Sequence, residues 1–326
     1  MTRLGYQIPN FTYPDVDQRG LFDVVAAQAK AADRSGFDTV LLMDHFYQLF
    51  TLGPPDAYML ECYTTLAALA RETTNVRLGS LVTGNTYRNP TLLAKIITAL
   101  DIVSNGRAQL GIGAGWFELE HSSLGFEFGT FSDRFEKLEE ALQIILPMLR
   151  GERPTLAGKH YTVHEAINQP PPISRIPIMI GGSGEKKTLR MVAQYADESN
   201  LTSPMSQLPH KLEVLAAHCD RLGRDRSEIT VSQALNVVVA DTHDDAYRDI
   251  VGFLSLRGLD IEAMEETARD QILAMVAWGD EDEVGETIAR ALELGADGVT
   301  CSLPGTGHIP EKVEQLGQVA SKVLGL

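Results

Sequence analysis

Short apolar runs alternate with helical apolar repeats along the chain. A strand-like pattern at residues 4–8 precedes a helical repeat at 21–32, and an almost continuous apolar run at 37–43 precedes a second helical repeat at 60–72. Strands that are apolar at nearly every position are typical of parallel sheets buried on both faces. The alternation continues and predicts eight strands, at residues 4–8, 37–43, 76–82, 107–112, 177–180, 198–201, 229–239 and 298–302.

The connections between the later strands are also mostly helical. Further helices are predicted at residues 89–104, 133–149, 187–195, 208–222 and 283–294. Eight parallel strands joined by helices favour an α/β fold of the (β/α)₈ (TIM) barrel type, with an open doubly wound sheet as the alternative. A hairpin within residues 151–177 and an acidic helical stretch at 244–276 are predicted as insertions. Since such a barrel takes about 250 residues or more, we expect residues 1–326 to form one domain.

Composition narrows the function classes. The formal charge of −16 disfavours binding to nucleic acid, because no long basic run offsets it. The apolar runs are far shorter than the roughly 20 residues of a membrane span, and the N-terminal residues lack the apolar region of a secretory signal. We therefore expect a cytoplasmic protein without membrane contact. The three cysteines show no CxxC spacing, so a disulfide framework or a zinc site is not predicted.

The ends of the predicted strands carry the candidate chemistry, since a barrel keeps its active site at that rim. Asp44 and His45 directly follow the second strand. Such a pair can orient a ligand and exchange a proton near neutral pH, although a purely structural histidine remains the alternative. The other small or polar residues at strand ends are Thr83, Gly113, Ala114, Gly115, Gly181, Gly182, Thr202 and Cys301.

Two glycine-rich segments also lie at strand ends. Residues 111–115 begin like a dinucleotide fingerprint, but the third glycine is missing and Trp116 begins a long loop. The segment is either a turn or a place where a flat ring approaches the backbone closely. Residues 181–184 lead into a helix, whose start favours anions. Because Lys186, Lys187 and Arg190 follow, a phosphate site is predicted there.

Histidines, carboxylates and aromatic residues elsewhere in the sequence are candidates for metal and substrate sites. His160 and His164 lie in a strand-like segment, and Glu120 and His121 do not match a metalloprotease motif, so no metal is predicted. Three aromatic residues in the loop after the fourth strand are candidates for an apolar substrate cleft, with packing of the loop as the alternative. They are Trp116, Phe117 and Phe126.

Five motifs, taken in order, carry a family resemblance. They are the residues at 42–46 (LMDHF), 78–83 (LGSLVT), 87–90 (YRNP), 111–116 (GIGAGW) and 180–182 (IGG). The chain resembles the bacterial luciferase-like superfamily, in its branch of coenzyme F420-dependent oxidoreductases. The resemblance implies that His45 lies beside the reactive ring as the catalytic proton-transfer group. It implies cofactor contacts for Asp44, Ser80, Leu81, Thr83, Ala114, Gly115, Gly181, Gly182 and Gly184.

The resemblance also implies a hydride transfer between the deazaflavin and a small organic substrate, in a homodimer. The cofactor would be coenzyme F420, with a monooxygenase that uses reduced FMN, or a non-catalytic flavin-binding barrel, as alternatives. Members of this branch commonly have a cis non-proline peptide in the third strand, here expected at Ser80–Leu81 to within one residue. Their glucose-6-phosphate dehydrogenases have a catalytic glutamate where this chain has Trp116, which argues against a sugar phosphate. Glu118 or Glu120 would replace that acid if the loop folds back.

Overall fold

The central sheet of the computed structural model, which describes residues 3–255 and 257–326, is a parallel barrel. Its strands follow the sequence pattern because their side chains are buried almost throughout, as in β2 and β9. The barrel strands are β1 (Leu4–Ile8), β2 (Thr39–Leu42), β3 (Arg77–Ser80) with β4 (Thr83–Gly84), β5 (Leu110–Gly113), β8 (Ile178–Gly181), β9 (Glu198–Leu201), β10 (Thr230–Val239) and β12 (Gly298–Ser302).

Hydrogen bonds close the sheet on itself. The strands pair in the order β3-β2-β1-β12-β10-β9-β8-β5-β4. The two ends meet where the Leu78 amide donates to the Arg107 carbonyl at 2.8 Å and the Gln109 amide donates to the Leu78 carbonyl at 2.9 Å. With β3 and β4 counted as one interrupted strand, the described residues contain the eight predicted strands, and the predicted (β/α)₈ barrel is confirmed.

The third strand differs from its prediction as one continuous strand at 76–82. The Leu81 amide still pairs with the Leu42 carbonyl of β2 at 2.8 Å, whereas Thr83 already pairs with Ile112 of β5. Between them the chain bulges, and the peptide bond Leu81–Val82 is cis. The bond lies one residue after the expected position at Ser80–Leu81.

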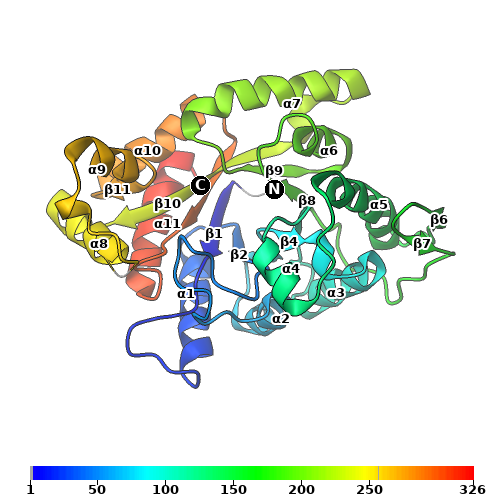
Figure 1. The fold of residues 1–326 in the computed structure, drawn as a ribbon, viewed down its shortest axis with the longest axis horizontal. Helices are drawn as coiled ribbons and strands as arrows, with labels where there is room; N and C mark the ends of the chain where they lie inside the picture. Colours follow the sequence, from blue (N-terminus) through cyan, green and yellow to red (C-terminus); the bar gives the residue numbers. More distant parts are fainter. Residues whose placement is uncertain (1–2, 256) are drawn as a thin grey trace.

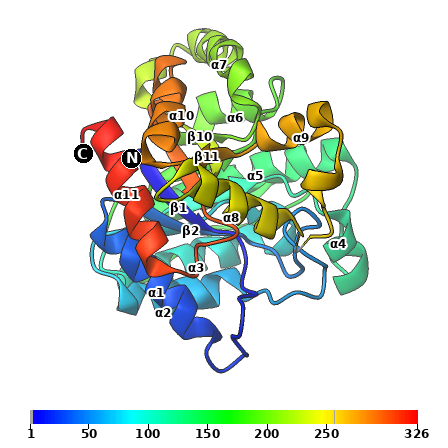
Figure 2. The same ribbon diagram turned by 90° about the vertical axis from the view of Figure 1, so that its left-hand side faces the viewer.

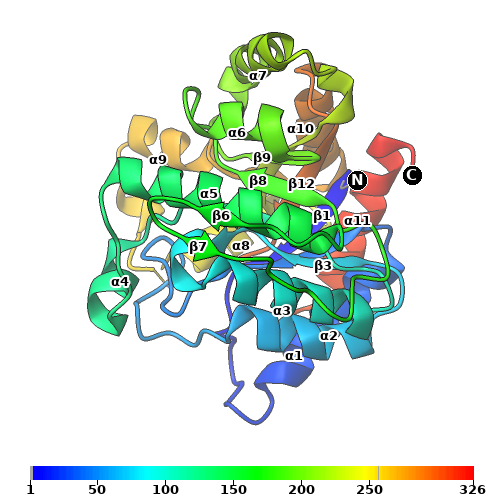
Figure 3. The ribbon, with the colours of Figure 1, turned by 90° about the vertical axis from the view of Figure 1, so that its right-hand side faces the viewer.

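Helices surround the barrel, as Figure 1 shows. The C-terminal helix α11 (Pro310–Leu324), which was not predicted, lies against both α1 (Leu21–Arg34) and α10 (Glu281–Glu293). Short strands β6 (Leu156–Ala157) and β7 (Thr162–Val163) form the predicted hairpin, visible in Figure 3. The helices around the barrel are α1 (Leu21–Arg34), α2 (Cys62–Glu72), α3 (Pro90–Val103), α5 (Phe131–Leu149), α6 (Thr188–Tyr195), α7 (Leu208–Leu222), α10 (Glu281–Glu293) and α11 (Pro310–Leu324).

The acidic insertion is not one helical stretch. It contains α8 (His243–Ser255), α9 (Glu266–Leu273) and a short strand β11 (Ala277–Gly279), which pairs with β10. The helix cannot continue through Gly258, whose φ of +74° is left-handed. The insertion has its own apolar cluster, which includes Ile250, Leu254 and Ile261.

A second helix was also missed, in the segment after Trp116 that was predicted as a loop. Helix α4 (Glu118–Leu124) begins with two acidic residues in its first turn, which favour a helix N-terminus, and ends at Gly125 with φ of +78°. Figures 2 and 3 show α4 and α9 on the side of the molecule toward which β1 runs, at the carboxyl ends of the strands. Among the described residues, no helix is long and apolar enough to cross a bilayer.

Candidate active site

A cavity of about 620 Å³ opens at the carboxyl ends of the barrel strands. Its volume lies within the roughly 300–1,000 Å³ that small-molecule sites occupy. The structure brings together residues from the ends of β2, β3/β4, β5 and β8. Of the residues predicted to bind cofactor or to react, those that line the cavity are Asp44, His45, Leu81, Thr83, Ala114, Gly115, Gly181 and Gly182.

Two predicted residues do not line this cavity. Ser80 is fully buried, and its hydroxyl lies 2.6 Å from the Thr83 hydroxyl and donates to the Gly111 carbonyl at 3.1 Å. Ser80 thus supports Thr83, which does line the cavity. Gly184 is exposed in the turn before α6, where an added Cβ would lie 2.9 Å from the Thr188 hydroxyl. A direct cofactor contact for either residue stays a prediction.

His45 is held by a buried carboxylate. Its Nδ1 lies 3.0 Å from Oε2 of Glu120, which belongs to α4 and has no exposed side-chain surface. The segment after the fourth strand therefore does fold back, and of the two acids considered there it is Glu120 that reaches the site. Glu118, two residues earlier on α4, is exposed.

Glu120 has further partners besides His45. The Tyr87 hydroxyl donates to Oε2, and the backbone amides of Phe46 and Tyr47 both donate to Oε1, the latter at 2.8 Å. Burial alone would raise the pKa of the Glu120 carboxyl, but the hydrogen bonds from His45, Tyr87 and the Tyr47 amide lower it below its ordinary value. Glu120 is accordingly a carboxylate at neutral pH.

Asp44 is neutralised by Arg88, a residue to which the sequence analysis gave no role. The guanidinium Nη1 and Nη2 donate to Oδ2 and Oδ1 at 2.7 and 3.0 Å, and the Gly84 amide donates to Oδ2 at 3.1 Å. Nη2 also donates to Glu61 at 2.7 Å. The pair ties the end of β2 to the residues after β4 and so fixes the neighbouring His45 on the rim.

The glycines of β5 and β8 make room for the bulge of the third strand. An added Cβ on Gly113 would lie 2.9 Å from Cγ2 of Val82, and one on Gly181 would lie 2.8 Å from Cγ1 of the same side chain. From the sequence, residues 111–115 were expected either to form a turn or to admit a flat ring. The structure adds another role, because Gly113 and Gly181 admit Val82, which itself lines the cavity.

Replacing Gly181 with Ala is expected to lower the free energy of unfolding by about 1–3 kcal/mol, because the methyl group overlaps Val82 in a packed region. Chemical denaturation measures the change. Gly252→Ala in α8 is the matched control, since no atom of the described residues lies within 4 Å of an added Cβ there, and it should be neutral or stabilising by up to about 1 kcal/mol. Equal stability of Gly181→Ala and wild type would contradict the proposed packing.

Aromatic side chains form one part of the rim. Trp116 lines the cavity with 55% of its surface exposed and meets the His45 ring edge-on at 5.8 Å. Phe117 is buried and stacks on Trp116, with ring centres 5.2 Å apart. Phe126 instead packs on Phe46 and Tyr87 and does not line the cavity. Of the three aromatic candidates, only Trp116 is placed to meet a ligand directly.

The predicted basic cluster is partly neutralised. Arg190 makes two hydrogen bonds to Glu139, at 3.0 and 2.7 Å. Lys187 lies over the rings of Phe131 and Phe135, which line the cavity, and in the described part of the chain it forms no ion pair. Arg134 also lines the cavity and donates to the Gly115 carbonyl at 3.1 Å. Lys187 and Arg134 are therefore available to an anion near the rim.

Among the described residues, one buried polar atom on the cavity wall lacks a hydrogen-bond partner. Asn200 at the end of β9 donates to the Ser232 hydroxyl at 3.0 Å, whereas its Oδ1 accepts no hydrogen bond within the described structure. Buried acceptors are nearly always satisfied, so an unpaired one on a cavity wall indicates a ligand donor. A ligand with an N–H or O–H group at this position would satisfy the Asn200 oxygen.

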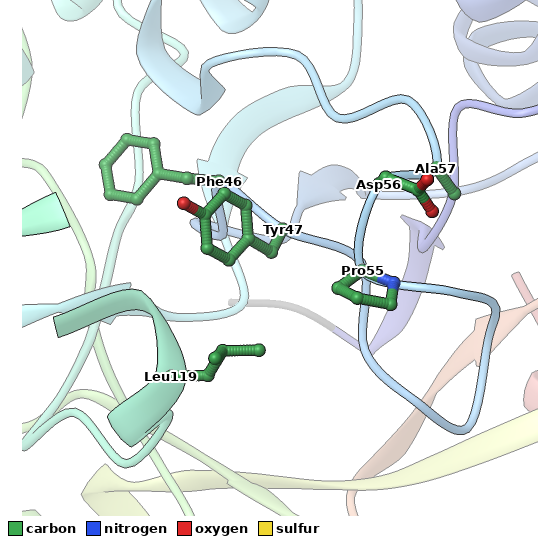
Figure 4. Close-up of a pocket in the computed structure, with 6 residues that line it drawn as sticks. All are labelled: Phe46, Tyr47, Pro55, Asp56, Ala57 and Leu119. Atoms are coloured by element: carbon green, nitrogen blue, oxygen red, sulfur yellow. The ribbon is translucent and has the colours of Figure 1, made fainter. Parts of the chain in front are cut away.

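A second, shallower cavity of about 470 Å³ lies between α4 and the loop that follows His45. Figure 4 shows Leu119 of α4 below the ring of Tyr47, whereas the ring of Phe46 points away from Leu119. The other residues that line it are Pro55, Asp56 and Ala57. Its lining is mostly apolar and holds no pair of groups suited to acid–base chemistry, so the larger cavity is the candidate active site.

One group of side chains in the described residues has the spacing of a metal site. Asp133, Glu136 and His160 offer ligand atoms within 4.8 Å of one another. The Lys159 ammonium donates to Glu136 at 2.7 Å and to Asp133 at 3.4 Å. Because a cation of the protein already pairs with both carboxylates, we read the group as an ion-pair cluster.

Comparisons with known proteins bear on the family and the fold of this chain. The profile of the family described as luciferase-like monooxygenase matches residues 2–298. An F420-dependent glucose-6-phosphate dehydrogenase of Microbacterium testaceum (strain StLB037) is 30% identical over 81% of this chain and 82% of its own length. One of Nakamurella multipartita is 28% identical, with 86% of each chain covered. The solved structure of an F420-dependent secondary alcohol dehydrogenase with an F420–acetone adduct has a TM-score of 0.82 at 18% identity, over 99% of both chains.

Proposed function

This chain belongs to the luciferase-like monooxygenase family, and from that premise we propose that it transfers a hydride between coenzyme F420 and a small organic substrate. The observation that carries the proposal is the cavity at the strand ends, with His45 on one side and the unpaired Asn200 Oδ1 on another. The F420-dependent relatives supply the choice of cofactor. Homodimer formation and a cytoplasmic location, which the sequence suggested, stay predictions.

The residues of the cavity suit a bound deazaflavin. Leu81, Val82, Ala114 and Gly115 offer backbone and apolar contacts for a flat ring. Asn200 Oδ1 would accept a hydrogen bond from an N–H at the edge of that ring. When bound, the deazaflavin supplies the hydride chemistry, and the protein contributes positioning and electrostatics.

His45 is the proposed proton-transfer group. Its ring lines the cavity, and its Nδ1 is engaged by Glu120, which leaves Nε2 as the nitrogen for a substrate. If the substrate is an alcohol, its hydroxyl proton would pass to Nε2 as its carbon gives up a hydride. In the reverse direction, the protonated ring would return that proton to the carbonyl oxygen.

The rim favours an apolar or flat substrate. Trp116 stands beside His45 and is half exposed, as is Phe131 farther along the rim. By the family resemblance, Trp116 stands where the glucose-6-phosphate dehydrogenases of this branch would carry a catalytic glutamate. We therefore propose a substrate other than a sugar phosphate. A panel of secondary alcohols, ketones and enones, with glucose 6-phosphate included, tests this choice.

Titration with cofactors tests the proposal as a whole. We expect oxidised F420 to bind with a Kd in the micromolar range or below, measured by the change of deazaflavin fluorescence. FMN should bind at least about tenfold more weakly, a difference of about 1.4 kcal/mol. Micromolar binding of FMN with none of F420 would favour the monooxygenase alternative instead. F420 binding without turnover of any substrate in the panel would favour a non-catalytic barrel.

Lys187 is the proposed contact for the negatively charged tail of F420. Replacing Lys187 with Met keeps the apolar stem over Phe131 and removes the charge, so we expect the Kd of F420 to rise about two- to fivefold. The same deazaflavin without its phosphate-bearing tail is the matched control, and its Kd should not change. Equal weakening of both ligands would show that Lys187 acts through packing.

A further inference from the structure

We propose that Glu120 is the positioning residue that fixes the tautomer of His45, so that the ring presents an unprotonated Nε2 to the cavity. The inference rests on the proposed function, since it explains how His45 would serve as the proton acceptor there. The hydrogen bonds of the two Glu120 oxygens determine the tautomer whether or not a cofactor is bound.

Each oxygen of Glu120 has its own set of donors. Oε1 accepts from the backbone amides of Phe46 and Tyr47, which follow His45 directly. Oε2 accepts from the Tyr87 hydroxyl and lies 3.0 Å from Nδ1 of His45. A carboxylate only accepts hydrogen bonds, so Nδ1 must carry the proton. In the neutral ring, Nε2 is then the acceptor.

The position of the carboxylate is rigidly defined. Its side chain has no exposed surface, and backbone amides fix one oxygen while Tyr87, which is itself buried, fixes the other. The low pKa of Glu120 keeps it ionised, and an anion beside Nδ1 also stabilises the imidazolium that forms when Nε2 accepts a proton. A purely structural carboxylate would not need to engage the ring of a residue on the cavity wall.

Glu120→Gln tests the inference because it replaces the hydrogen-bond acceptor beside Nδ1 with a donor. The two backbone amides at the Oε1 position require an acceptor, so the Gln carbonyl must lie there and its NH₂ must take the place of Oε2. That NH₂ then donates to Nδ1 of His45 and forces the proton onto Nε2. We expect long-range ¹⁵N–¹H NMR spectra of the imidazole to show an Nδ1–H tautomer in the wild type and an Nε2–H tautomer in the variant.

Two further variants are controls. Leu119→Ala changes the neighbouring residue of α4, which is 44% exposed and lines the second, shallower cavity, and should keep the Nδ1–H tautomer. Tyr87→Phe removes the other donor to Oε2 while leaving the carboxylate, and should also keep it. If Glu120→Gln does not fold, the wild-type and Tyr87→Phe spectra still decide, because an Nε2–H tautomer in either would overturn the inference.

Kinetics provides the second measurement and separates the inference from the proposed function. With a substrate of the F420 reaction, Glu120→Gln should lower kcat for alcohol oxidation about a hundredfold and leave KM nearly unchanged, because the ring then offers a proton instead of accepting one. A changed tautomer in a protein that does not bind F420 would support the role of Glu120 and refute the F420 proposal. F420 turnover by the wild type, with an unchanged His45 tautomer in Glu120→Gln, would support the F420 proposal and refute the role of Glu120.

Discussion

Replacing His45 with Asn is expected to lower kcat of the F420-dependent reaction by about 10²–10⁴-fold, the usual contribution of a positioned acid–base group. The Asn side-chain amide can still donate to Glu120 from a position close to that of Nδ1, so the carboxylate keeps a partner. What the variant loses is Nε2, the nitrogen that would exchange a proton with the substrate. The Kd of F420 should change by less than about threefold, a difference of under 1 kcal/mol.

His121 provides the matched control for this prediction. It is also buried near Tyr87, but both of its ring nitrogens are engaged, Nδ1 with the Phe117 carbonyl at 2.8 Å and Nε2 with the Thr86 hydroxyl at 2.7 Å. Because no nitrogen of His121 is left for a substrate, His121→Gln should affect stability more than kcat. Turnover by His45→Asn at the wild-type rate would remove the proton-transfer role from His45.

The strands of the barrel could be predicted because burial on both faces leaves a clear apolar run in the sequence. The elements that were missed are those in which local signals are short or mixed. Helix α4 has only seven residues, although its acidic first turn and Gly125 were detectable signals. The insertion reads as one acidic helix until Gly258, whose left-handed backbone separates α8 from α9.

The candidate site, too, could be predicted only in part from the sequence. His45 and the glycines were found because they directly follow apolar strands, and strand ends of a barrel gather at one rim. Glu120 could be named as a possible acid, but its contact with His45 joins residues 75 positions apart and depends on how α4 folds back. Arg88 lies in a motif that was noted, yet its partner Asp44 was assigned to the cofactor, since local sequence does not show which charges pair.

Replacing Arg88 with Met is expected to lower the free energy of unfolding by about 3–5 kcal/mol, because the change leaves the Asp44 carboxylate buried without its counterion. The side chains of Asp44 and Arg88 are only 1% and 10% exposed, so water compensates poorly for the lost partner. Met fills a similar volume, which keeps a cavity from adding to the effect. Chemical denaturation at neutral pH measures the change.

The double variant Arg88→Met with Asp44→Asn separates charge from packing. It should recover most of the lost stability, because the neutral amide has no uncompensated charge.

Burial raises the pKa of the Asp44 carboxyl, and Arg88 opposes that rise, so loss of Arg88 raises the folded-state pKa further above its unfolded value. The folded single variant then binds a proton that the unfolded chain lacks as the pH falls through that pKa, which stabilises it. The stability difference between single and double variants should therefore be largest at neutral pH and shrink toward acid pH. A difference independent of pH would show that Arg88 stabilises the rim through packing and not by pairing with Asp44.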